Sequence, residues 1–222
     1  MATSTFYPAA GASSPVDGYT GTNTSGTFSE VMAANGVFAS ATSTELAAIR
    51  LETAGIADNF SRNQRVIFGF DTSAIPDIDT VTGATLSVYF TATTQGLGDT
   101  DLDLVSASPG SESNIVAGDY QSNFGSTRLA TGFSLSGISP NAYNGFTLNA
   151  SGLSHISKTG TTFFGMLLKW DLDDSFTGTW AGSVATNATI RFADYAGTAY
   201  DPKLVVEHSE VTATFTPSVM IF

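Results

Sequence analysis

The chain has 222 residues, of which 42% are hydrophobic, and its 8 basic and 20 acidic residues give a net charge of −12. This length fits one large all-β domain, and 16 Phe with 7 Tyr supply enough aromatic area for a core without disulfides or a metal. The negative charge disfavours nucleic acid and anionic lipid as partners. Because cysteine is absent, thiol nucleophiles, cysteine-type zinc sites and iron–sulfur clusters are excluded.

The first residues, MATSTFYPAAG, lack the basic n-region and the apolar h-region of a secretion signal. No apolar run in the chain approaches the roughly 20 residues that a membrane span needs. We therefore expect a protein that is made in the cytoplasm and has no membrane span. A mature form from which a leader has been removed would look the same apart from Met1.

Short strands are expected at residues 3–8 and 17–20, and a stretch rich in Thr, Ser, Ala, Gly and Asn follows at 21–47, which favours turns and loop. The strongest pattern lies in residues 64–92, where two alternating segments flank a turn that contains Pro76. This pattern predicts two adjacent antiparallel strands of a β-sandwich. The apolar face of the second strand consists of Ala84, Leu86, Val88, Phe90 and Ala92.

From residue 49 onward the alternation predicts eight strands, at residues 49–53, 65–71, 84–93, 101–106, 145–148, 163–172, 189–194 and 203–208. Two segments, 118–124 and 151–158, predict short helices that close the ends of the sandwich, the second with Ser151 as its N-cap. We expect one domain over residues 1–208 and a C-terminal extension over 209–222. The side chains predicted to be buried are Phe68, Phe70, Leu86, Val88, Phe90, Met166, Leu168, Trp170, Phe192 and Val206.

Three stretches occur in an order typical of one family: QRVIFGFDTSAIPDIDTVTGATLSVYF, FTLNASGLSHISKTGTTFFGMLLKWDLDD and IRFADYAGTAYDPKLVVEH. Over about residues 49–208 the chain resembles the jelly-roll domains known from their DNRLRE-type signature, which occur in surface proteins and in phage-encoded structural proteins. DPKLVV at 201–206 resembles the closing strand of that family, whereas the DNRLRE letters themselves are absent. The resemblance implies an antiparallel jelly-roll β-sandwich with a non-enzymatic, structural or adhesive role, and it carries over no catalytic residue.

The carboxylates of Asp99, Asp101 and Asp103 alternate along a predicted strand, so we expect them about 7 Å apart on one solvated outer face. Clustered carboxylates suit calcium, but a strand spreads them along a line, and the Asp-x-Asp-x-Asp-Gly spacing of an EF-hand is missing. A solvated acidic face is therefore the favoured interpretation.

The better calcium candidates are Asp171, Asp173 and Asp174, because they precede the loop SFTGTW and a loop is able to converge its oxygens on a cation. Plain turn chemistry remains the favoured interpretation of these residues as well. We expect no transition metal, no other cofactor and no calcium requirement for folding.

The two histidines, His155 and His208, share no metal-binding motif. No Gly-x-Ser-x-Gly elbow accompanies the abundant serines, so a Ser-His-Asp mechanism is not indicated. A glycosidase with paired carboxylates would need acidic groups flanking a cleft, whereas the acids here cluster on predicted outer faces and turns. We therefore expect no enzymatic activity.

Four aromatic residues in turn-rich segments are the candidates for sugar contact, because flat rings stack on pyranose faces. The alternative is that such aromatics cap the ends of the core. The residues are Tyr143, Trp180, Tyr195 and Tyr200.

The C-terminal extension alternates, breaks at Pro217 and ends in an apolar run. Exposed apolar area costs roughly 25 cal/mol per Å². The segment is therefore expected either to fold back on its own domain or to dock on another subunit by strand addition or pocket insertion. The candidate assembly residues are Val211, Phe215, Val219, Met220, Ile221 and Phe222.

These observations lead to the hypothesis of a non-enzymatic structural component of a virion, such as a phage capsid decoration or tail-associated protein. Such a protein is made in the host cytoplasm, contacts other protein subunits and forms a homo-oligomer. The alternative hypothesis is a secreted, extracellular carbohydrate-binding or adhesive module.

Overall fold

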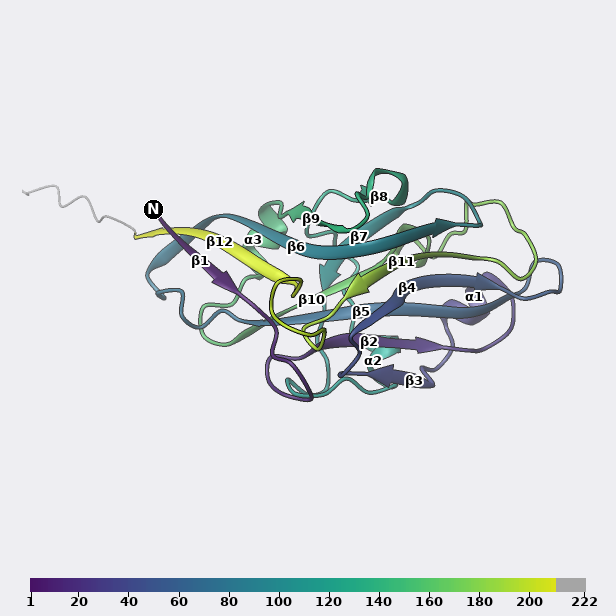
Figure 1. Cartoon of the computed structure of the whole chain (residues 1–222), viewed down its shortest axis with the longest axis horizontal. Helices are drawn as coiled ribbons and strands as arrows, with labels where there is room; N and C mark the ends of the chain where they lie inside the picture. The colour runs from purple at the N-terminus through teal and green to yellow at the C-terminus, as the bar shows by residue number, and fades with distance from the viewer. Residues whose placement is uncertain (211–222) are drawn as a thin grey trace, which may run out of the picture.

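In the computed structural model, which describes residues 1–210, an antiparallel sheet curls over itself into a β-sandwich (Figure 1). The predicted all-β fold is confirmed. The strands are β1 Ala2–Phe6, β2 Asp17–Thr22, β3 Phe38–Ser40, β4 Glu45–Thr53, β5 Phe60–Asp71, β6 Asp79–Gln95, β7 Asp101–Ser106, β8 Phe133–Ser134, β9 Ala142–Thr147, β10 Thr161–Leu168, β11 Ala185–Arg191 and β12 Lys203–Glu210. The helical segments are α1 Phe28–Met32, α2 Asp119–Ser122, α3 Ala150–His155, α4 Lys169–Leu172 and the 3₁₀ turn η1 Leu135–Gly137.

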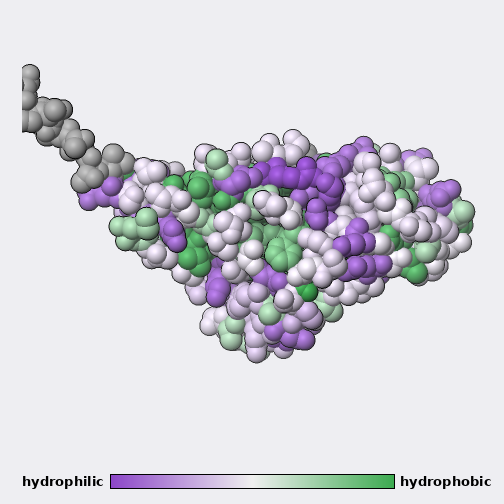
Figure 2. Space-filling view, turned by 90° about the horizontal axis from the view of Figure 1, so that it is seen from above, coloured by the Kyte–Doolittle hydropathy of each residue, from purple (hydrophilic) through white to green (hydrophobic). Residues whose placement is uncertain are grey.

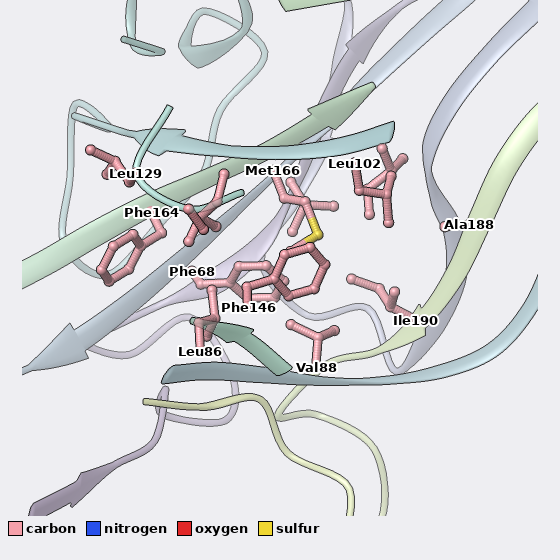
Figure 3. Packing of buried hydrophobic residues seen from close by; sticks show 14 of the residues in the cluster. Phe68, Leu86, Val88, Leu102, Leu129, Phe146, Phe164, Met166, Ala188 and Ile190 are labelled. Atoms are coloured by element: carbon pink, nitrogen blue, oxygen red, sulfur yellow. The ribbon is translucent and has the colours of Figure 1, made fainter. Parts of the chain in front are cut away.

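Neighbouring strands follow the order β1-β12-β6-β11-β4-β5-β10-β7-β8, with β9 paired to β6, and β2 paired to both β5 and β3. The strands before β4 in this order, with β9, form the first layer, and those after it, with β2 and β3, form the second. Strand β4 joins the two layers, because it pairs with β11 on one side and with β5 on the other. Apolar side chains from both layers meet in the core (Figure 3), among them Phe68, Leu86, Val88, Phe146, Phe164 and Met166. All ten side chains predicted to be buried are at most 2% exposed, so that prediction is confirmed.

Strand β6 organises the first layer, and its register explains where the chain leaves the sheet. Phe90 pairs with Ala142 of β9 and with Ile190 of β11. Leu86 likewise pairs with β9 and with β12. Because a strand has only two edges, β11 and β12 lie end to end along the same edge of β6. Residues 192–202 therefore form a loop that leaves the sheet in the middle of the molecule.

The prediction that the two alternating segments of residues 64–92 are adjacent strands is wrong. Strand β5 pairs with β2, β4 and β10, whereas β6 pairs with β9, β11 and β12. The connection at 72–78 crosses from one layer to the other and buries Ile75, which is 1% exposed. Both strands present an apolar face to the same core, and alternation does not distinguish paired strands from strands that face each other.

The predicted strand at 163–172 ends earlier than expected. Strand β10 stops at Leu168, and α4 turns Trp170 into the core. One helical turn places apolar side chains inward as well as a strand does, which the alternation could not reveal.

Two further predictions are corrected near the helices. The N-cap of α3 is Asn149, not Ser151, because the Gly152 N–H donates to Asn149 Oδ1 at 3.0 Å. The loop predicted at 21–47 contains α1 and β3, and α1 begins with a capping box formed by Thr27 and Glu30.

Hydrophobic residues on the face seen in Figure 2 form small groups among hydrophilic ones. The large apolar side chains that are exposed come from separate segments, and the most exposed after Met1 are Ile56 at 68% and Ile78 at 64%. No helix in residues 1–210 is long and apolar enough to cross a membrane.

Candidate functional site

The 7–16 loop and the 192–202 loop meet where β11 ends and β12 begins, along the edge of β6 that these two strands share. The Gly11 N–H donates to Asp194 Oδ1 at 2.8 Å, and the Ala193 N–H donates to Asp17 Oδ2 at 3.0 Å. In Figure 1 the yellow-green loop before β12 and the purple loop after β1 lie together at the lower middle. The chain turns sharply here, with Gly197 at a φ of 80°, a left-handed conformation that favours glycine.

A pocket of about 610 Å³ lies between these loops, and we call it the tyrosine pocket. Its lining combines two tyrosines and two carboxylates with small residues, and it contains no Lys or Arg. The lining residues are Tyr7, Pro8, Ala10, Ala193, Asp194, Tyr195, Ala196, Gly197, Thr198 and Asp201.

The outer face of the first layer carries a cluster of aromatic rings around Arg191, the last residue of β11. The Arg191 guanidinium carbon lies 3.9 Å from the ring centroid of Tyr195, 4.3 Å from that of Tyr200 and 5.0 Å from that of Tyr89. Arg191 also donates to Glu45 at 2.9 Å. These contacts are cation–π interactions that hold the 192–202 loop against the sheet.

Tyr143 of β9 extends this cluster. Its ring lies 5.4 Å from that of Tyr89, and the Lys203 ammonium lies 4.2 Å from its centroid. The Tyr143 hydroxyl donates to the Asp201 carbonyl at 2.9 Å and to the Ala199 carbonyl at 3.1 Å. Tyr143 therefore anchors the end of the loop that forms the pocket.

Three of the four predicted sugar-contact residues, Tyr143, Tyr195 and Tyr200, are thus brought together, and the fourth is not. Trp180 is half-buried, packs against the main core and donates to the Asn59 carbonyl at 3.2 Å. Its position matches the alternative interpretation, in which an aromatic in a loop caps the core.

The carboxylates of Asp17, Asp194 and Asp201 lie at the tyrosine pocket: Asp194 and Asp201 line it, and Asp17 accepts from the N–H of Ala193, another lining residue. The sequence-based expectations did not include this group. Asp17 is fully buried, and Asp201 is 4% exposed. Each carboxylate of this group has one buried oxygen without a hydrogen-bond partner among the described residues: Asp17 Oδ1, Asp194 Oδ2 and Asp201 Oδ1. A buried polar atom without a partner costs about 1–3 kcal/mol, and most buried polar atoms in folded proteins have a partner. Three such oxygens in one group are therefore unusual.

Electrostatics indicate that the three carboxylates lie near one another. Burial raises the pKa of Asp17 to about 8, against the lowering effect of the Ala193 N–H, and Asp194 and Asp201 raise it further. Burial and then Asp194 raise the pKa of Asp201 above its ordinary value. The only sequence signal was that Asp17 starts a predicted strand and Asp201 starts the DPKLVV segment.

The local backbone explains how Asp17 becomes buried. Gly18 has a φ of 155°, and a Cβ built on it would lie 2.1 Å from the Ser40 carbonyl oxygen. Only glycine allows β2 to approach the end of β3 this closely. Asp17, the residue before this close approach, pairs with Phe68 of β5 and is fully buried.

The carboxylates predicted to form one solvated face on β7 do not do so. Asp103 is 1% exposed and accepts from Arg128 Nε at 2.9 Å, so the prediction is wrong at this position. The segment that carries Arg128 covers this part of β7. Asp99 instead accepts from the hydroxyls of Ser134 and Ser136, each at 2.6 Å.

Two of the calcium candidates face different arginines. Asp171 is buried and forms a bidentate pair with Arg65 at 2.6 and 2.7 Å. Asp173 bonds to Arg128 at 2.6 Å, while Asp174 is exposed. Within residues 1–210, no group of three or more His, Cys, Asp or Glu side chains is placed to hold a metal ion by itself.

A Ser-His-Asp arrangement occurs across three neighbouring strands, although no elbow motif predicts it. Ser4 Oγ lies 3.0 Å from His208 Nε2, and His208 Nδ1 lies 2.6 Å from Asp79 Oδ2. The cavity of about 310 Å³ beside Asp79 is lined by neither Ser4 nor His208. We therefore assign the contact to cross-strand structure, because a nucleophile needs room for its substrate.

The remaining candidates lie elsewhere. His155 Nε2 lies 2.8 Å from the Phe163 carbonyl oxygen, and the imidazole ring lies 5.4 Å from that of Phe164. The candidate assembly residues, Val211 to Phe222, lie outside the described residues. Strand β12, from which they follow, pairs with β1, and β1 pairs with no other strand in residues 1–210.

No protein-family model matches the sequence, and a search of curated proteins finds no match. The similarity to DNRLRE-type jelly rolls therefore stays an expectation from the quoted stretches.

Proposed function

We propose that the protein is a non-enzymatic structural component of a virion, such as a phage capsid decoration or tail-associated protein. The observation that carries the proposal is the edge strand β1, whose outer side pairs with no strand in residues 1–210. An unpaired edge offers backbone N–H and C=O groups for strand addition by another chain. Because β1 borders β12, residues 211–222 follow from the strand next to this edge.

The architecture supports the same proposal. The sandwich buries a large aromatic and aliphatic core without any cysteine, which suits a subunit that folds before it joins an assembly. The net charge of −12 favours solubility of the free subunit. Assembly then depends on defined contacts rather than on a broad apolar surface.

Deletion of residues 211–222 tests this function. We expect the full chain to form a defined oligomer in sedimentation velocity, and the deletion variant to be monomeric with its Tm changed by less than about 2 °C. Survival of the oligomer after the deletion, or a monomeric full chain at all concentrations, would contradict the proposal. The genes beside the coding sequence give a second test, because capsid, portal or tail genes are expected there.

A second candidate function is carbohydrate binding, and the tyrosine pocket favours it. The pocket offers the rings of Tyr7 and Tyr195 for stacking and carboxylates for sugar hydroxyls. Tyr7 is 47% exposed, so one ring is accessible to a ligand. On a virion or on a cell surface, such a pocket would give an adhesive role.

A glycan array tests the second function. We expect the full chain to bind a limited set of glycans, and Tyr7→Ala and Tyr195→Ala to weaken that binding at least about tenfold. Ile56→Ala is the matched control, because Ile56 is exposed and does not line the pocket. Equal glycan binding by the full chain and the three variants would show that the tyrosine pocket is not the binding site.

A further inference from the structure

The carboxylates at the tyrosine pocket, Asp17, Asp194 and Asp201, have no cationic partner in the part of the chain that the structure describes. The ion pairs found in residues 1–210 include none of Asp17, Asp194 and Asp201. Each of these side chains nevertheless has one buried oxygen without a hydrogen-bond partner. Acidic groups are thus concentrated in a buried region where desolvation disfavours their charged forms.

The hydrogen bonds show which oxygens remain free. Asp17 Oδ2 accepts from the Ala193 N–H, and Asp194 Oδ1 accepts from the Gly11 N–H. These bonds fix the two carboxylates between the loops and leave the second oxygen of each without a donor. Asp201, which is 4% exposed, has Oδ1 in the same state.

We propose that Asp17 and Asp201 hold a calcium ion at the tyrosine pocket, with backbone carbonyl oxygens of the surrounding loops completing its coordination. Two carboxylates with carbonyl oxygens suit this ion, because calcium takes six to eight oxygen ligands in flexible geometry. Asp194 adds negative charge close by. The site contains no His or Cys, which excludes the ligands that zinc and copper prefer.

A proton or a water molecule compensates this group only in part. One proton, which Asp17 holds at neutral pH because burial raises its pKa to about 8, neutralises one charge and, when shared, satisfies two of the three free oxygens, but it leaves two negative charges in place. One water molecule donates two hydrogen bonds and leaves all three charges in place. A divalent cation neutralises two negative charges and is coordinated by the free oxygens.

The ion has a structural consequence for the pocket. Asp17 belongs to β2, whereas Asp201 ends the 192–202 loop and Asp194 holds the 7–16 loop. A shared ion therefore links the three segments that shape the tyrosine pocket. The site differs from the sequence-based expectation, which named Asp171, Asp173 and Asp174 as the better calcium candidates, favoured plain turn chemistry for them and included no calcium requirement for folding.

Thermal unfolding of the full chain tests the site after chelation and removal of the chelator. At constant ionic strength and at a calcium concentration of about 100 Kd, the Tm should rise by about 5–10 °C. Magnesium at the same concentration should raise the Tm much less, because it demands stricter geometry. The absence of any calcium-dependent shift would overturn the proposal.

Variants locate the ion. Asp17→Asn and Asp201→Asn should lose the calcium-dependent shift. Without calcium, Asp17→Asn should melt at or above the wild-type temperature, because an amide is neutral in a buried position without having to take up a proton. Asp174→Asn, an exposed position among the earlier candidates, should keep the full shift. If Asp174→Asn loses the shift while Asp17→Asn keeps it, the proposed location is wrong.

Terbium luminescence gives a measurement that does not depend on stability. Terbium takes calcium sites, and the rings of Tyr195, Tyr200 and Tyr143 near this loop are able to sensitise it. We expect emission that calcium displaces, with a decrease of at least about tenfold in Asp201→Asn. Emission that persists unchanged in both Asp17→Asn and Asp201→Asn would also overturn the proposal.

Discussion

Asp171 and Asp17 are both buried carboxylates, and they differ in what faces them. Arg65 binds Asp171 through two bonds, and Asn63 donates to it at 2.8 Å. Asp17 accepts a hydrogen bond from the Ala193 N–H, and the negative charges of Asp194 and Asp201 add to the effect of burial in raising its pKa. Burial of a carboxylate therefore does not by itself mark a binding site. The presence or absence of a cation within the fold distinguishes a structural group from one that needs an external partner.

The Arg65 region is closed by several further contacts. The Arg65 guanidinium lies 4.2 Å from the ring centroid of Tyr120, and it also donates to the Tyr120 carbonyl. The Tyr120 hydroxyl donates to the Val31 carbonyl at 3.1 Å. Every charged oxygen of Asp171 has a donor here, so the network joins β5, α2 and α4 without any ligand.

The largest effect is expected from Arg65→Met. This change leaves Asp171 buried without its cation, so the free energy of unfolding should fall by about 3–5 kcal/mol. Urea denaturation measures the loss. The control is Arg62→Met, whose side chain is 38% exposed and which should cost less than about 1 kcal/mol. Equal losses for the two variants would contradict the view that Asp171 depends on its partner.

A smaller loss is expected from Arg128→Met. Arg128 bonds to buried Asp103 and to exposed Asp173, but its own side chain is 36% exposed. Water is therefore able to replace part of the lost interaction, and we expect a decrease of about 1–3 kcal/mol. A second change, Asp103→Asn, should recover part of the loss because it removes the buried charge. A double variant that is less stable than Arg128→Met alone would contradict this explanation.

The opposite sign is expected from Asp17→Asn in calcium-free buffer. The amide keeps an oxygen for the Ala193 N–H and adds donors that face Asp194 and Asp201. The free energy of unfolding should rise by about 1 kcal/mol, which is the usual contribution of one hydrogen bond. A decrease of several kcal/mol, like that of Arg65→Met, would mean that Asp17 already has a partner in the protein alone.

The smallest effect is expected from Asp174→Asn. Asp174 is exposed and follows the end of α4, so its charge is solvated. The free energy of unfolding should change by less than about 0.5 kcal/mol, with or without calcium. A larger change that depends on calcium would return the cation site to the 171–174 segment.

The sequence predicts the sandwich and its core because alternation depends only on which side of a strand faces the interior. Phe90 and Met166 are buried for that reason, and β7 has the bounds that the pattern predicts. The sequence does not predict which strands pair, because β5 and β6 show the same alternation whether they are paired or face each other. Only the tertiary structure reveals that the 72–78 connection crosses between layers.

The candidate site was only partly predictable. The tyrosines Tyr143, Tyr195 and Tyr200 were identified as sugar-contact candidates in turn-rich segments, but their assembly around Arg191 depends on β11 and β12 lying end to end. Asp103 and Asp171 were predicted to lie on a solvated face and in a turn, but both are buried, because spacing along the chain does not determine burial. Asp103 and Asp171 gained arginine partners from distant segments, whereas Asp17 and Asp201 gained none.

The most direct measurement of the central claim is a crystal structure obtained with calcium, with anomalous differences used to locate the ion. The account predicts one peak with Asp17 Oδ1 and Asp201 Oδ1 among its ligands, at about 2.3–2.6 Å. A peak at Asp171 or Asp173, or a water molecule without anomalous signal between Asp17 and Asp201, would contradict it.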